Sequence, residues 1–163
     1  MNRKYRIMPM TLYTAILILM DQISKYIIVK TMNIGESISV IGEVLQITSH
    51  RNYGAAWGML QNQMIFFYII TIIVLIALIY FYYKEAADNL LMQCGLMLIF
   101  AGAVGNFIDR LFRGNVVDFI DTKIINYDFP IFNVADSCLT IGVFILLYEL
   151  LFNQKEEKSH GNI

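Results

Sequence analysis

The chain has 163 residues and a formal net charge of −1, and it is 58% hydrophobic but only 15% charged, with two prolines and two cysteines. Soluble domains carry roughly 25% charged residues, so this chain is too apolar to be an ordinary soluble domain. The composition also excludes a disordered chain and a disulfide scaffold. The near-neutral charge argues against a nucleic-acid-binding protein.

Four apolar segments are long enough to cross a bilayer, which takes about 20 helical residues. The segments are 8–28, 64–83, 89–108 and 134–152. The second and third contain no Asp, Glu, Lys or Arg, and five residues separate them, which indicates a membrane hairpin. We therefore predict an all-α membrane protein, a four-transmembrane-helix bundle that forms one domain over residues 1–163.

The distribution of positive charge predicts the orientation in the membrane. Arg3, Lys4 and Arg6 lie directly before the first span, and cytoplasmic ends of spans carry an excess of Lys and Arg. We therefore expect both termini to be cytoplasmic and the two long loops, 29–63 and 109–133, to lie outside.

The first outer loop contains signals of local structure. Ser37–Ile41 and Val44–Thr48 alternate like strands around Gly42 and predict a small extracytoplasmic β-hairpin. The segment 52–60 is rich in small residues and carries Trp57, which suits an interfacial segment lying on the membrane.

Polar side chains gather at the outer ends of the predicted spans. They are Asp21, Asn106, Asp109 and Asp136, and Asp118 lies in the predicted outer loop between the last two spans. Ionisable groups at membrane depth are costly and mark functional sites. Each also has a simpler explanation: Asp21 and Lys25 have the spacing of a helical ion pair, and Asp136 could cap the last helix. Asp118 has only apolar neighbours in sequence, which predicts a raised pKa for its carboxyl group.

The residue types restrict the chemistry. Only two histidines are present, without an H-E-x-x-H motif, and no G-x-S-x-G motif occurs, so zinc and serine hydrolases are poorly supported. Two neighbouring aspartates that share a proton can hydrolyse a peptide bond without a metal or cofactor. A proton relay through Asp21, Asp109, Asp118 and Asp136 remains an alternative. An inactive membrane anchor is a third, although it would not explain the clustered polar residues.

Five motifs in chain order carry a resemblance to a known family. They are Asp21-Gln22-x-x-Lys25, Asn52-x-Gly54-Ala55-Ala56-Trp57-Gly58, Ala101-Gly102-Ala103-x-Gly105-Asn106-x-x-Asp109-Arg110, Gly114-x-Val116-x-Asp118-Phe119 and Phe132-Asn133-x-Ala135-Asp136. With these motifs the chain resembles bacterial lipoprotein signal peptidase, also called signal peptidase II or prolipoprotein signal peptidase, over nearly its whole length.

The resemblance implies a membrane aspartyl endopeptidase of the bacterial cytoplasmic membrane, with its active site near the outer leaflet. Such an enzyme removes the signal peptide from diacylglyceryl-modified prolipoproteins just before the lipid-modified cysteine. The resemblance further implies inhibition by the cyclic peptide globomycin, contact with phospholipid, a monomeric state, and no cofactor, metal or nucleic acid.

Motif positions carry the implied roles to individual residues. Asp118 and Asp136 would be the catalytic pair. The implied substrate-binding residues are Asn52, Gly54, Asn106, Arg110, Asn133 and Ala135. The implied structural supports are Asp21, Lys25, Asp109 and Trp57.

Overall fold

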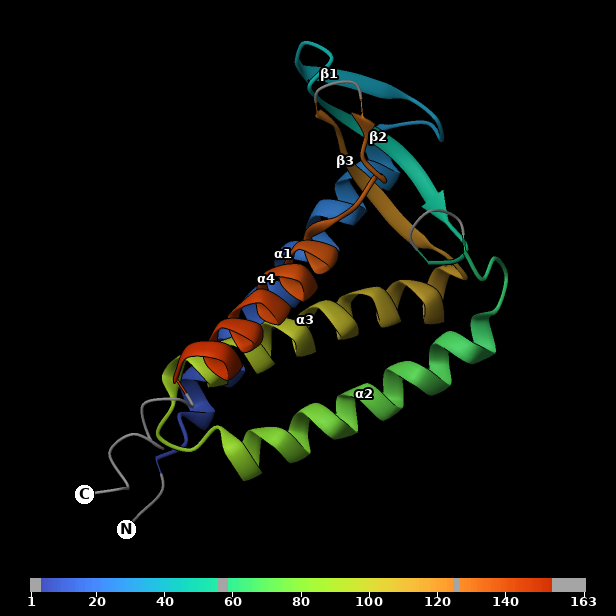
Figure 1. Cartoon of the computed structure of the whole chain (residues 1–163). Helices are drawn as coiled ribbons and strands as arrows, with labels where there is room; N and C mark the ends of the chain where they lie inside the picture. The colour runs from blue at the N-terminus through green and yellow to red at the C-terminus, as the bar shows by residue number, and fades with distance from the viewer. Residues whose placement is uncertain (1–3, 56–58, 125–126, 154–163) are drawn as a thin grey trace, which may run out of the picture.

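The computed structural model describes residues 4–55, 59–124 and 127–153, and it shows four long helices with a small sheet at one end (Figure 1). The elements are α1 (Ile7–Thr31), β1 (Ser37–Ile41), β2 (Leu45–Asn52), α2 (Met64–Glu85), α3 (Leu90–Arg113), β3 (Val116–Ile124), β4 (Tyr127–Asp128) and α4 (Val134–Tyr148), which continues as a π-helical turn, η2 (Glu149–Asn153). Four helical segments are long and apolar enough to cross a membrane. The predicted four-helix membrane fold with a small β element is therefore confirmed.

Local sequence signals explain where the helices begin and end. The side chain of Asn89 accepts a hydrogen bond from the backbone of Met92 and so caps the start of α3. Gly114 ends α3 with φ of +69°, a conformation that favours glycine. In α1, Pro9 lies in the first turn, where the missing N–H is tolerated.

Helix α3 is the centre of the bundle, because it packs against α1, α2 and α4. Glycines allow the closest of these approaches: a Cβ atom on Gly102 would collide with the carbonyl oxygen of Ala135 in α4. Among the other helices, α2 makes extensive contacts only with α3. Along α2, only Phe67, Leu78 and Tyr82 are buried. Most of α2 therefore faces its surroundings, which suits a lipid environment.

The four strands form one antiparallel sheet in the order β1-β2-β3-β4. Ile28 and Met32 at the end of α1 pack against Val117 and Phe119 of β3, and this apolar cluster fixes the sheet on the bundle. The predicted hairpin is present, but its second strand continues to Asn52. Sequence patterns did not indicate β3 and β4.

The predicted end of the third span, at residue 108, was wrong. Helix α3 continues to Arg113, so Asp109 and Arg110 lie in its last turns and not in the outer loop that we expected to begin at residue 109. The exposed apolar residues Leu111 and Phe112 explain the difference, because they extend the membrane-facing side of the helix past the first charged pair. Trp57 lies outside the described residues.

Candidate active site

A cavity of about 970 Å³ extends from the underside of the sheet to the space between the helices. Helices α2, α3 and α4 supply one part of its lining, and β2, β3 and the segment 129–132 supply the other. The cavity therefore joins the space between the apolar helices to the sheet.

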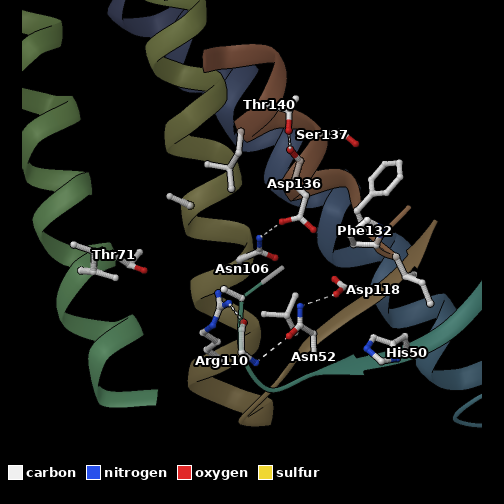
Figure 2. Close-up of a pocket in the computed structure, with 18 of the residues that line it drawn as sticks. His50, Asn52, Thr71, Asn106, Arg110, Asp118, Phe132, Asp136, Ser137 and Thr140 are labelled. Carbon is white, nitrogen blue, oxygen red and sulfur yellow. Dashed lines mark hydrogen bonds between the residues drawn. The ribbon is translucent and has the colours of Figure 1, made fainter. Parts of the chain in front are cut away.

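Asp118 of β3 and Asp136 in the first turn of α4 both line this cavity (Figure 2). Asp118 accepts hydrogen bonds from the amide nitrogens of Asn52, at 3.0 Å, and Asn133, at 2.6 Å. Asp136 accepts from the amide nitrogen of Asn106, at 2.7 Å, and from the backbone N–H of Asn133, at 3.2 Å. Amide groups thus hold all four carboxyl oxygens in place.

Asn133 connects the start of α4 to both carboxyl groups. Its side-chain oxygen accepts a hydrogen bond from the backbone N–H of Asp136 at 2.9 Å, and the two residues form a capping box. Its side-chain nitrogen meanwhile donates to Asp118. Asp136 is therefore the N3 residue of the capping box and also lines the cavity, so its contribution to the helix start is compatible with a role in the site.

The carboxyl group of Asp118 is suited to hold a proton. Burial and the nearby charge of Asp136 raise its pKa from 3.8 to about 7, against the opposing effect of the hydrogen bonds from Asn52 and Asn133. The direction of this shift is the one that the apolar neighbours of Asp118 in the sequence predict.

A buried ionic cluster lies behind the cavity wall. The ammonium group of Lys25, which is 0% exposed, lies 2.9 Å from a carboxylate oxygen of Asp21 and 3.2 Å from one of Asp109. Lys25 also donates a hydrogen bond to the side-chain oxygen of Asn106 at 3.0 Å, which leaves the amide nitrogen of Asn106 directed at Asp136.

The same cluster joins the helices to the sheet. A carboxylate oxygen of Asp21 in α1 accepts a hydrogen bond from the backbone N–H of Ala135 at 2.9 Å. A carboxylate oxygen of Asp109 in α3 accepts one from the backbone N–H of Val117 at 3.1 Å. Each backbone group belongs to the residue next to Asp136 or Asp118. The cluster thus fixes both segments that carry the cavity carboxyl groups, and removing one partner from such a buried ion pair is strongly destabilising.

Arg110 closes another side of the cavity. Its guanidinium donates to the carbonyl oxygen of Gly54 at 3.0 Å and lies 4.4 Å from the centre of the Phe67 ring. Gly54 in turn donates its backbone N–H to the side-chain oxygen of Asn52 at 2.9 Å, which directs the Asn52 amide nitrogen at Asp118.

The structure brings most of the sequence-predicted residues to this site. Asn52, Gly54, Asn106 and Arg110 line the cavity. Asn133 and Ala135 do not line it: they are 0% and 1% exposed and lie behind the wall. The buried Asp21, Lys25 and Asp109 form the ionic cluster.

Sequence patterns did not indicate His50 or the segment 129–132, both of which line the cavity. His50 lies two residues before Asn52 on β2, so strand alternation could have placed the two side chains on one face. Across residues 4–55, 59–124 and 127–153, no group of three or more His, Cys, Asp or Glu side chains could hold a metal ion.

Paired carboxyl groups that line one cavity between apolar helices and a sheet suit the hydrolysis of a peptide bond beside an apolar segment. The class of protein that this fold and site define is a membrane-embedded aspartic peptidase. Comparison with family models agrees, because residues 13–152 match the model of Signal peptidase (SPase) II. The chain belongs to the signal peptidase II family.

Relatives with similar sequences extend over almost the whole chain. The lipoprotein signal peptidase of Staphylococcus carnosus (strain TM300) is 54% identical over 158 residues, which is 97% of this chain and 99% of the relative. That of Staphylococcus aureus (strain JH9) is 56% identical over 158 residues, 97% of each. The resemblance seen in the motifs is thereby confirmed.

Two solved structures share the fold. One, described as a bacterial membrane enzyme structure at 2.3 Å resolution, has a TM-score of 0.91 and 56% identity and covers 96% of this chain and 95% of its own. The other, described in the same words at 1.9 Å resolution, has a TM-score of 0.86 and 58% identity and covers 93% and 98%.

Proposed function

We propose that this protein removes signal peptides from prolipoproteins and cuts just before the lipid-modified cysteine. One observation carries the proposal. Two carboxyl groups that accept hydrogen bonds from asparagine amides line the same cavity, and this cavity continues between apolar helices. The names of the similar staphylococcal proteins support the substrate class.

Asp118 and Asp136 are the proposed catalytic pair. With its raised pKa, Asp118 holds the proton near neutral pH. Asp136 lies at the N-terminus of α4, where the helix dipole favours a negative charge, so it serves as the general base. Asp136 takes a proton from water as the oxygen attacks the scissile carbonyl carbon, and Asp118 gives its proton to the carbonyl oxygen.

The tetrahedral intermediate then collapses. The proton returns from the oxygen to Asp118, the C–N bond breaks, and the leaving nitrogen takes the proton held by Asp136. The products are the carboxyl end of the signal peptide and the free amino group of the lipid-modified cysteine. Every proton in this sequence is carried by the two carboxyl groups, in accordance with aspartic-peptidase chemistry.

The residues that surround the pair divide into two groups. Asn52, Gly54, Asn106 and Arg110 contact the substrate chain around the scissile bond, and the apolar helix side of the cavity accommodates the acyl chains and the signal helix. Behind them, Asn133, Ala135 and the cluster of Asp21, Lys25 and Asp109 keep the carboxyl groups oriented.

The proposal includes a location and an environment. Both termini lie in the cytoplasm and the sheet lies at the outer leaflet, where a lipid-modified cysteine is held by its acyl chains. The protein acts as a single domain and as a monomer among phospholipids, and globomycin inhibits it by occupying the cavity. A proton relay is less well supported, because Lys25 engages both Asp21 and Asp109 in ion pairs.

Incubation of the purified protein in detergent with a diacylglyceryl-modified precursor tests the proposal. We expect a decrease in precursor size, and mass spectrometry should find the new amino terminus at the modified cysteine. Globomycin should block the reaction. A precursor that stays intact, or cleavage that does not require the lipid, would contradict the proposed function.

A further inference from the structure

The two ends of the cavity differ in chemistry, and the difference indicates where a substrate chain leaves the site. Ile70 and Val74 of α2 and Leu139 of α4 line the end between the helices. The other end lies under the sheet, where His50 and the segment 129–132 line it. The lipid and the apolar signal segment of a substrate suit the apolar end between the helices. The chain after the scissile bond is therefore expected at the end under the sheet.

A β-bulge turns His50 toward the sheet end of the cavity. The pairing of β2 with β3 is regular from Leu45 to Ile47 and then shifts, so that His50 lies opposite Asp118. Continued regular pairing would have placed Ser49 there. Directly opposed residues of antiparallel strands project from the same face with Cβ atoms about 5 Å apart. The bulge therefore gives His50 the same face as Asp118.

The hydrogen bonds of the carboxyl pair do not engage the His50 imidazole. Both oxygens of Asp118 accept from Asn52 and Asn133, and the His50 side chain is exposed at the cavity. Figure 2 shows His50 and Phe132 on the side of Asp118 that is opposite to Arg110. The imidazole can therefore donate to a chain that passes Asp118 on its way out of the cavity.

The segment after β4 forms the facing apolar surface. The rings of Phe129 and Phe132 pack edge to face at 5.8 Å, and both residues line the cavity. The backbone N–H and carbonyl groups of Phe132 bind Ile120 of β3, so the sheet fixes this surface. An extended peptide between the aromatic pair and His50 would have its backbone within reach of the imidazole.

We propose that His50 binds the residues directly after the lipid-modified cysteine and donates a hydrogen bond from its imidazole to a backbone carbonyl of that extended segment. The inference rests on the proposed function and assigns one substrate-positioning residue to it. His50 acts on binding of the mature chain and takes no part in proton transfer.

Two lipid-modified precursors that differ only after the cysteine test this role. One ends at the cysteine as an amide, and the other continues for a few residues. We expect His50→Ala to lower kcat/KM about three- to ten-fold with the longer precursor, mainly through KM, as loss of one hydrogen bond does. With the shorter precursor the same variant should match the wild type.

Two further variants complete the comparison. His50→Gln keeps an N–H donor and should recover most of the loss with the longer precursor. Glu43→Gln, in the exposed turn of the hairpin, should behave as the wild type with both. The wild type itself should cleave the longer precursor with the higher kcat/KM, and His50→Ala should remove that preference.

If His50→Ala lowered kcat/KM equally with both precursors, His50 would act on the carboxyl pair. If kcat/KM were unchanged with both precursors, His50 would have no role in the site. Both results overturn the inference, as does a wild type that shows no preference for the longer precursor. Failure of the wild type to cleave either precursor would instead overturn the proposed function itself.

Discussion

Asparagine side chains determine how the two cavity carboxyl groups are held. Asn52, Asn106 and Asn133 each use their amide nitrogen to bind an aspartate, while their oxygens are occupied by Gly54, Lys25 and the backbone of Asp136. Because each oxygen already has a donor, the amide orientation is fixed, and the nitrogens point to the carboxyl groups.

Asp118→Asn and Asp136→Asn should each lower cleavage of a lipid-modified precursor by at least about a hundred-fold, because an amide keeps the shape but cannot exchange the proton. Turnover by the purified variants measures the effect, and size-exclusion chromatography in detergent checks the fold. Asp128→Asn, whose carboxyl group is exposed on β4, is the matched control and should retain activity. Turnover at a tenth of the wild-type rate would contradict the assignment.

The pKa of Asp118 makes stability depend on pH. Its folded-state pKa of about 7 lies above the ordinary 3.8, so between these values the folded form binds more protons than the unfolded form. The free energy of unfolding therefore falls as pH rises through this range. From about pH 5 to about pH 8, the thermal midpoint of the wild type should fall further than that of Asp118→Asn. Parallel midpoints for the two proteins would contradict the raised pKa.

At the scale of elements, the contact between α3 and α4 positions Asp136 relative to the rest of the site. Gly102 faces the carbonyl of Ala135, directly before Asp136, and a Cβ atom on Gly105 would lie 2.6 Å from a carboxylate oxygen of Asp21. The absence of side chains on these glycines lets the start of α4 approach both α3 and the ionic cluster.

Gly102→Ala should separate α4 from α3 and lower both stability and activity. Overpacking of this kind costs about 1–3 kcal/mol, because the added methyl group meets the backbone carbonyl oxygen of Ala135 as well as the side chain of Leu139. Thermal unfolding in detergent and precursor turnover measure the two effects. Val143→Ile adds one carbon on the exposed side of α4 and should change neither. If Gly102→Ala were as stable as Val143→Ile, the contact between α3 and α4 would accommodate the added methyl group, and the prediction would be wrong.

The sequence predicted some elements well and others poorly, for physical reasons. Charge-free runs identify α2 and α3, because few other structures need 20 consecutive apolar residues. Strand β3 was missed because its first four residues are all buried, so it lacks the alternation of a half-exposed strand. The carboxyl pair followed from the apolar neighbours of Asp118 and from the position of Asp136 at the start of a predicted span. The roles of Asn133 and His50 instead depend on a helix cap and a β-bulge, which tertiary contacts define.

The whole molecule has its polar site at the end of the bundle where the sheet lies, and the α2–α3 connection and the described start of α1 lie at the other end (Figure 1). The orientation of these two ends determines which side of the membrane a substrate must reach. The positive charges before the first span predict that the sheet is outside.

Cysteine labelling in intact cells tests this orientation. In a background with Cys94→Ala and Cys138→Ala, Ser39→Cys on β1 should react with a membrane-impermeant reagent. Glu85→Cys, at the end of α2, should react only after the cells are permeabilised. The reverse pattern would place the cavity at the inner leaflet and contradict the proposed location.

The order of the elements also matters while the protein is being made. Asp118 and Asp136 lie on β3 and α4, and Asp136 is held by Asn106 of α3 and by Asn133 at the start of α4. A ribosome-bound chain that has inserted only its first three spans lacks one member of the pair and the cap that orients both. Under the proposed mechanism, such a nascent chain cannot hydrolyse neighbouring membrane proteins, and hydrolytic competence begins only when the last span enters the bilayer.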